Sequence, residues 1–152
     1  MLQAGDRVPD FETRDQHGNT VKLQDLRGQK IAIYFYPKDD TPGCTKQACN
    51  LRDNYKELQD AGIKILGASL DDEASHQKFI SKFDLPFPLL SDTDKSLAES
   101  FGVYGERSFM GKKYMGVART TFLIDEQGSI KKVISKPDVE AHTDEILEAF
   151  AT

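Results

Sequence analysis

The two cysteines of this 152-residue chain are the side chains best suited to covalent chemistry. Cys44 follows Pro42 and Gly43 and stands at the start of an apolar pattern that is typical of one helix face. A thiol at the beginning of a helix faces unpaired backbone N–H groups and the positive end of the helix dipole, so its thiolate form is favoured. Because the thiolate is the attacking form of a cysteine, we expect Cys44 to act as a nucleophile.

The residues just before Cys44 fit a small pocket that accepts an anion. Pro42 has no N–H group to lose, and its fixed φ angle suits the approach to a first helical turn. Gly43 leaves room for a substrate oxygen close to the backbone. Thr41 lies three residues before Cys44, so we expect its hydroxyl to hydrogen-bond both the sulfur and a bound substrate oxygen.

The segment from Pro37 to Cys49 resembles the active-site motif of peroxiredoxins. The match is the spacing Pro37-x-x-x-Thr41-x-x-Cys44, and Cys49 five residues later is similar to the bacterioferritin comigratory protein (PrxQ) branch, which is of the atypical 2-Cys type. The resemblance extends over nearly the whole chain, including residues 5–11, 85–92 and 119–125. It implies an enzyme that reduces hydrogen peroxide and alkyl hydroperoxides, and we expect no metal or other cofactor.

The same resemblance assigns Arg119, which opens the run Arg-Thr-Thr-Phe, a place beside the sulfur of Cys44. A fixed cation there favours the thiolate and steadies negative charge that develops during the reaction. Pro37, with Pro42 and Gly43, is assigned to the substrate pocket. Gln47 is a departure, since this branch often carries an acidic residue at that position, and its effect on rate or on helix opening stays open.

Cys49 lies five residues after Cys44, which is an unfavourable spacing for a disulfide within one helix. On an ideal helix, two Cα atoms five residues apart are about 8.7 Å from each other. A disulfide usually needs about 4.4–6.8 Å. If both cysteines lie on the helix, residues 44 to 50 must therefore unwind before a Cys44–Cys49 bond can form.

The resulting hypothesis is a two-thiol reaction cycle. Cys44 attacks the terminal peroxide oxygen and becomes a sulfenic acid, and Cys49 then condenses with it to give an intramolecular disulfide. Thioredoxin or a similar dithiol protein is the expected reductant of that disulfide.

The cysteines also allow other interpretations. Either thiol, taken singly, could be a small buried hydrophobic residue, and a thiol of another molecule could replace Cys49. A zinc site would need two more ligands, and His17, His76 and His142 are scattered along the chain. A cysteine hydrolase needs a histidine beside Cys44, and the C-x-x-C of a thioredoxin-type oxidoreductase is missing.

A further alternative is not an enzyme: a binding module that a Cys44–Cys49 disulfide switches without multiple turnover. Without the resemblance, Arg119 would be expected to pair with a surface carboxylate and Thr41 to end a turn. The acidic runs at residues 39–40 and 71–73 are expected to solvate loops and cap helices, with no chemical role.

Composition excludes several classes of protein. The formal charge is −5 and no basic tract is present, so binding to nucleic acid is not expected. The first residues lack a signal peptide, and the longest apolar run, Ile31 to Tyr36, is too short to span a membrane. We therefore expect a cytoplasmic protein that folds as one domain over residues 1–152, and a monomer because the cysteine pair is self-contained.

Regular elements must position these side chains, and their pattern predicts a strand, helix, strand, helix order. A hairpin is expected over 11–23, strands over 30–37, 63–68 and 87–90, and a second hairpin from strands 117–124 and 129–135. Helices are expected over 44–59, 71–83, 95–101 and 141–150. This order indicates an α/β fold of the thioredoxin-like type, a layered sandwich with a mixed central β-sheet and helices on both faces.

Overall fold

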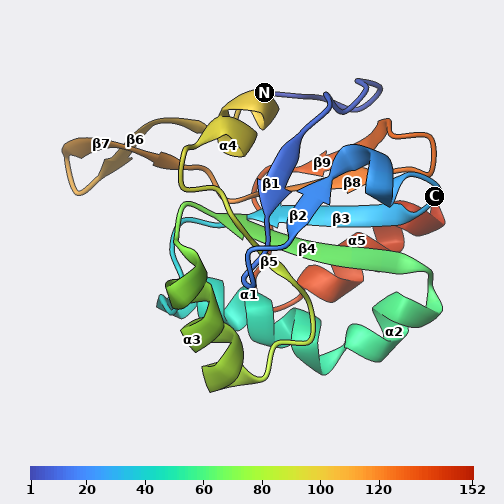
Figure 1. The fold of residues 1–152 in the computed structure, drawn as a ribbon, viewed down its shortest axis with the longest axis horizontal. Helices are drawn as coiled ribbons and strands as arrows, with labels where there is room; N and C mark the ends of the chain where they lie inside the picture. The colour runs from blue at the N-terminus through green and yellow to red at the C-terminus, as the bar shows by residue number, and fades with distance from the viewer.

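A five-stranded mixed sheet forms the centre of the molecule, which the computed structural model describes over residues 1–152 (Figure 1). The strand order is β5-β4-β3-β8-β9, with β3 parallel to β4 and antiparallel to β8. The strands are β3 (Lys30–Phe35), β4 (Ile63–Ser69), β5 (Leu89–Ser91), β8 (Thr120–Ile124) and β9 (Ile130–Ile134). The predicted thioredoxin-like α/β sandwich with a mixed sheet is therefore confirmed.

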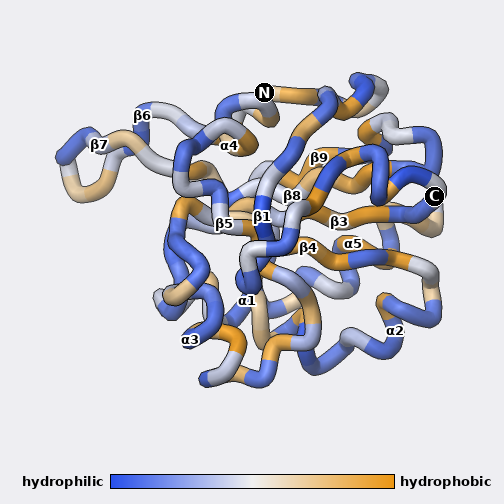
Figure 2. Tube along the Cα trace, viewed as in Figure 1, coloured by the Kyte–Doolittle hydropathy of each residue, from blue (hydrophilic) through white to orange (hydrophobic).

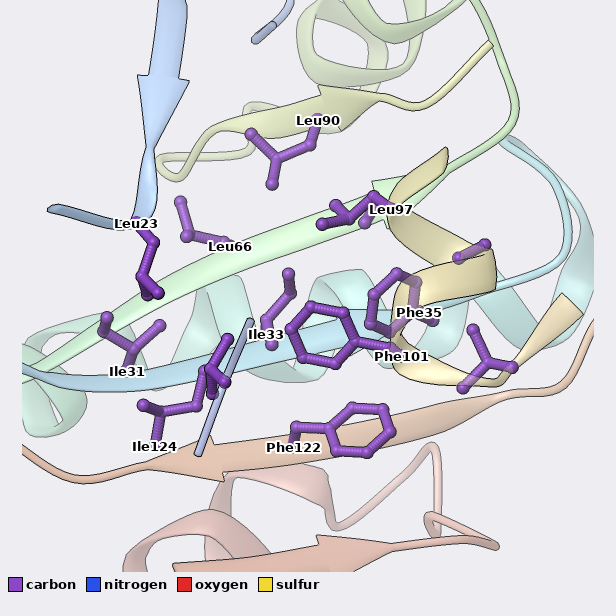
Figure 3. Close-up of a cluster of buried hydrophobic side chains, with 14 of the residues drawn as sticks. Leu23, Ile31, Ile33, Phe35, Leu66, Leu90, Leu97, Phe101, Phe122 and Ile124 are labelled. Carbon is purple, nitrogen blue, oxygen red and sulfur yellow. The ribbon is translucent and has the colours of Figure 1, made fainter. Parts of the chain in front are cut away.

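The central strand β3 is buried on both sides, as its continuous apolar run predicts. Because strand side chains alternate, Ile31, Ile33 and Phe35 pack into one hydrophobic cluster, whereas Ala32 and Tyr34 pack into a second cluster on the opposite face. Figure 3 shows the first cluster between β3, β4, β8 and the neighbouring helix, and Figure 2 shows the apolar strands enclosed by polar turns and helix surfaces.

Helices cover both faces of the sheet. The face that carries Tyr34 is covered by α1 (Pro42–Asp53), α2 (Tyr55–Asp60), α3 (Glu73–Phe83) and α5 (His142–Ala151). The other face is covered by α4 (Ser96–Phe101), the short 3-10 helix η1 (Leu23–Leu26) and the hairpin of β1 (Glu12–Arg14) and β2 (Thr20–Lys22). None of the helices combines the length and the apolar character needed to cross a membrane.

Two predictions about the elements were wrong. The helix expected over 44–59 starts at Pro42 and is two helices, since Asn54 between α1 and α2 has non-helical angles of φ −116° and ψ 18°. The strand expected over 117–124 starts at Thr120, because Val117 ends a separate hairpin. That hairpin pairs β6 (Tyr104–Phe109) with β7 (Lys112–Val117) and projects away from the sheet in Figure 1.

Candidate active site

The first turn of α1 carries Cys44 as its third residue, rather than as its first residue as predicted. Thr41 occupies the N-cap position with an extended backbone, and Pro42 follows at the first helical position, where its missing N–H costs nothing. The N–H of Thr45 donates to the carbonyl of Thr41 at 2.8 Å and closes the turn. The preceding N–H groups have no partner within the helix, so the positive end of the helix dipole lies at Cys44.

Arg119 reaches this thiol from another part of the fold. Its Nη2 lies 3.3 Å from Cys44 Sγ, while its Nη1 donates to Gln47 Oε1 at 2.7 Å. The Cys44 side chain is only 1% exposed and Gln47 is fully buried. A cation held this close to a sulfur acts on it more strongly in a largely buried site than it would in water.

The pairing of β3 with β8 explains how Arg119 comes to lie there. Phe35, at the end of β3, is opposite Thr120 at the start of β8, and Arg119 directly precedes Thr120. The loop that leads to Cys44 leaves β3 at this same end of the sheet. The antiparallel register therefore brings together two side chains that are 75 residues apart in the chain.

Thr41 and Gly43 are placed differently from what the sequence suggests. The Thr41 hydroxyl donates to the carbonyl oxygen of Lys38 at 2.8 Å and makes no hydrogen bond to the sulfur. Since that bond uses its one proton, the oxygen of Thr41 can only accept further hydrogen bonds. A Cβ atom on Gly43 would lie 3.1 Å from Arg119 Nη2, so glycine leaves room for the guanidinium.

Pro37 follows β3 and Pro42 opens α1, and both are exposed. Cys49 is a free thiol that is half-buried, and it lies five residues after Cys44 within the same helix. The ideal-helix separation of about 8.7 Å between their Cα atoms therefore applies, and a disulfide cannot form while α1 is intact.

A buried polar network holds the loop before Cys44, and the sequence interpretation missed it. Asp39, expected to be solvated, is only 8% exposed, and its carboxylate accepts from Tyr36 Oη at 2.5 Å and Ser75 Oγ at 2.8 Å. Its Oδ2 also lies 2.7 Å from Nδ1 of His76, whose Nε2 lies 2.9 Å from the carbonyl oxygen of Leu90. The network fastens the loop to α3 and β5.

This network does not fit a metal site. Asp39, Asp71 and His76 offer ligand atoms within 4.8 Å of one another, but protein groups already satisfy those atoms. Asp71 Oδ2, for example, accepts from Ser69 Oγ at 2.6 Å and from the N–H of Asp39 at 2.9 Å. Neither cysteine belongs to the cluster, so the structure offers no support for the zinc interpretation.

A second buried histidine, His142, lies at the start of α5. Its Nε2 lies 2.8 Å from Thr121 Oγ1 on β8, and its Nδ1 lies 2.9 Å from Glu145 Oε1. Burial lowers the pKa of His142 below its usual value of 6.5, and the nearby Glu145 opposes this shift only in part. These partners fit a neutral ring that donates through Nδ1 and accepts through Nε2.

The chain is similar to known proteins over nearly its whole length. Residues 4–133 match the family model described as AhpC/TSA family. The chain is 49% identical over 146 residues to peroxiredoxin Bcp of Escherichia coli K12, covering 96% of this chain and 94% of that protein. It is 44% identical over 149 residues to peroxiredoxin Bcp of Bacillus subtilis, covering 98% and 95%.

The fold is also similar to solved structures of related proteins. The crystal structure of peroxidoxin BcpB from Mycobacterium tuberculosis has a TM-score of 0.88 at 38% identity, with coverage of 99% of this chain and 97% of that chain. A Xanthomonas campestris bacterioferritin comigratory protein, studied for its alkyl peroxide reduction activity, has a TM-score of 0.86 at 36% identity, with coverage of 93% and 90%.

Proposed function

This chain belongs to the AhpC/TSA family and is a thiol-dependent peroxidase of the peroxiredoxin Bcp group, and we propose that Cys44 is its peroxidatic thiol and Cys49 its resolving thiol. The observation that carries the proposal is the distance of 3.3 Å between Arg119 Nη2 and Cys44 Sγ at the start of α1. Two independent sources of positive charge, the guanidinium and the helix end, meet at one sulfur.

In the first step the thiolate of Cys44 attacks the terminal oxygen of a hydroperoxide. The O–O bond breaks, the sulfur is oxidised to a sulfenic acid, and the leaving oxygen takes a proton and departs as water or an alcohol. Arg119 stabilises the negative charge that spreads over the attacking sulfur and the two oxygens. The hydroxyl of Thr41 donates its proton to the carbonyl oxygen of Lys38, so its oxygen accepts a hydrogen bond from the substrate O–H and orients the O–O bond.

In the second step Cys49 resolves the sulfenic acid. The first turns of α1 unwind, the Cys49 sulfur attacks the Cys44 sulfur, and the hydroxyl group leaves as water while a disulfide forms. A dithiol protein such as thioredoxin then supplies two electrons and two protons and restores both thiols.

Turnover with a thioredoxin reducing system tests the proposal. With protein far below the peroxide concentration, the wild-type chain should consume many equivalents of hydrogen peroxide, and Cys44→Ser should consume none. Loss of only one equivalent of peroxide per chain would contradict an enzymatic role and favour a redox-controlled binding module.

Cys49→Ser separates the two steps. This variant keeps the first oxidation but lacks a local thiol, so sulfenic and then sulfinic acid should accumulate on Cys44. Mass spectrometry of the intact variant after peroxide treatment measures these products. Normal recycling of Cys49→Ser by the same reductant would show that a thiol of another molecule resolves Cys44.

We further propose hydrogen peroxide and alkyl hydroperoxides as the substrates, in line with the activity studied in the Xanthomonas campestris relative. The cysteine pair is self-contained within α1, which supports a monomer with one domain over residues 1–152, working in the cytoplasm, where thiols are kept reduced. Sedimentation of the reduced protein at a mass near 17.0 kDa is the expected result.

A further inference from the structure

Asn50, the residue after Cys49, joins α1 to the start of α5 through three hydrogen bonds. Its Nδ2 donates to the carbonyl oxygen of Glu140 at 2.9 Å, and its Oδ1 accepts from the N–H of Thr143 at 2.8 Å. Its backbone carbonyl accepts from Thr143 Oγ1 at 3.2 Å. We call these three hydrogen bonds the Asn50 bridge.

The bridge replaces the N-terminal cap that α5 lacks. Ala141 stands at the N-cap position, and no side chain of its own can accept from the first N–H groups of the helix. Thr143 is the second residue of α5 and is 1% exposed, so its N–H would be buried without a partner if Asn50 moved away. Lys46 of α1 also contacts Glu140, at 3.4 Å, but this ion pair lies in solvent and contributes little.

The bridge opposes the movement that the resolving step needs. Cys49 can reach Cys44 only after α1 unwinds, and Asn50 is bonded directly to Cys49 through the chain. Unwinding therefore has to break the bonds of Asn50 to Glu140 and Thr143. The intact bridge favours the folded helix, in which Cys44 lies beside Arg119 and can react with peroxide.

We propose that Asn50 is a positioning residue for the resolving step, which sets how often α1 opens and so how long Cys44 remains a sulfenic acid. The inference rests on the proposed function, since it concerns the disulfide between Cys44 and Cys49. A slower resolving step leaves more time for a second peroxide to oxidise the sulfenic acid to sulfinic acid. The bridge therefore also governs the sensitivity of the enzyme to inactivation by peroxide.

Asn50→Ala tests the proposal in the full-length reduced protein. The variant loses two side-chain hydrogen bonds that exist only while α1 is folded, so disulfide formation should become about tenfold faster. The peroxide step should keep its rate, because Asn50 does not touch Cys44, Thr41 or Arg119. Rapid mixing with hydrogen peroxide, followed by acid quenching and mass spectrometry, measures the two steps separately.

A second bridge variant and a control variant show whether the result is specific to the Asn50 bridge. Thr143→Val removes only the bond from Thr143 Oγ1 to the Asn50 carbonyl and should give a smaller acceleration of the same step. Asp94→Ala is the matched control, because it removes the carboxylate that accepts from the N–H of Ser96 at the start of α4, on the opposite face of the sheet. It should lower global stability and leave disulfide formation unchanged.

Hydrogen exchange supplies a readout that a general loss of stability would not reproduce. In Asn50→Ala, amides of α1 and of the first turn of α5 should exchange faster under native conditions, while amides of α4 should not. The variant should also require a higher dose of peroxide for sulfinic acid to accumulate.

The possible failures are distinguishable. If the wild-type protein forms no Cys44–Cys49 disulfide, the proposed function itself fails. If the wild-type disulfide forms and both Asn50→Ala and Thr143→Val leave its rate unchanged, or Asp94→Ala accelerates it equally, the inference about Asn50 is overturned while the proposed function stands.

Discussion

Gln47 holds the guanidinium of Arg119 against the thiol of Cys44. Its Oε1 accepts from Nη1 at 2.7 Å, which leaves Nη2 directed at the sulfur. The amide is neutral, so it orients the cation without cancelling its charge. Gln47 therefore supplies the acceptor that fixes the orientation of the guanidinium.

Removing the acceptor at Gln47 should slow the peroxide step. In Gln47→Leu the Nη1 of the half-buried Arg119 loses its partner and the guanidinium turns from the sulfur, so the rate constant for oxidation of Cys44 should fall about tenfold. Gln47→Glu keeps an acceptor and should retain most of the rate. Stopped-flow measurement with hydrogen peroxide compares the three proteins, and equal rates in all of them would exclude this role for Gln47.

At the scale of elements, the site depends on how α1, β8 and α5 contact one another. α1 supplies both thiols, and the start of β8 supplies Arg119. α5 contacts α1 through Asn50 and contacts β8 through the pair His142 and Thr121. The start of α5 thus contacts both α1, which unwinds in the proposed resolving step, and β8, which holds Arg119.

The buried side chain of His142 should make the free energy of unfolding depend on pH. Burial lowers the pKa of His142, so the folded protein binds a proton more weakly than the unfolded chain does. The free energy of unfolding should therefore fall as the pH drops below about 6.5, where the unfolded chain begins to take up the proton.

Urea unfolding at pH 7.5 and at pH 5.5 measures this dependence. His142→Gln cannot titrate, so its free energy of unfolding should change less between the two conditions than that of the wild type. His17→Gln is the matched control, because the His17 side chain is exposed. An identical pH dependence in the wild type and in His142→Gln would contradict the assignment.

For the whole molecule, the sheet separates two hydrophobic clusters, and only one of them contains residues of the site. The cluster that includes Cys44 lies under α1 and positions the thiol, whereas the cluster on the other face contains no residue of the site. In the cluster without Cys44, Phe101 is fully buried and its ring contacts those of Phe35 and Phe122 at centroid distances of 5.2 and 5.0 Å. Stability and catalysis should therefore respond separately to substitution.

Phe101→Ala should lower the free energy of unfolding by about 3–5 kcal/mol, because it leaves a cavity among aromatic rings. The rate of the peroxide step per folded molecule should not change. Phe109→Ala makes the same substitution at a side chain that is 67% exposed, and its effect should stay within about 0.5 kcal/mol. Denaturant unfolding and stopped-flow kinetics on the same samples provide both measurements.

Local pattern was enough to predict much of the fold. The apolar run that became β3, the hairpin of β1 and β2, and the cap of α3 by Asp72, which accepts from the N–H of Ser75 at 2.9 Å, all depend on neighbours in the chain. The break at Asn54 was missed because Tyr55 and Leu58 continue the apolar spacing across it. The hairpin of β6 and β7 was missed because its side chains are mostly exposed and show no alternation.

The sequence by itself determined that a thiol stands in the first turn of a helix, because capping and dipole effects act within a few residues. Only the tertiary structure decided what surrounds that thiol. The pairing of β3 with β8 brings Arg119 to the sulfur, and the burial of α1 turns Gln47 toward Arg119 and Asn50 toward α5. These contacts join segments 72 to 93 residues apart, and only the long-range packing of the sheet and its helices specifies them.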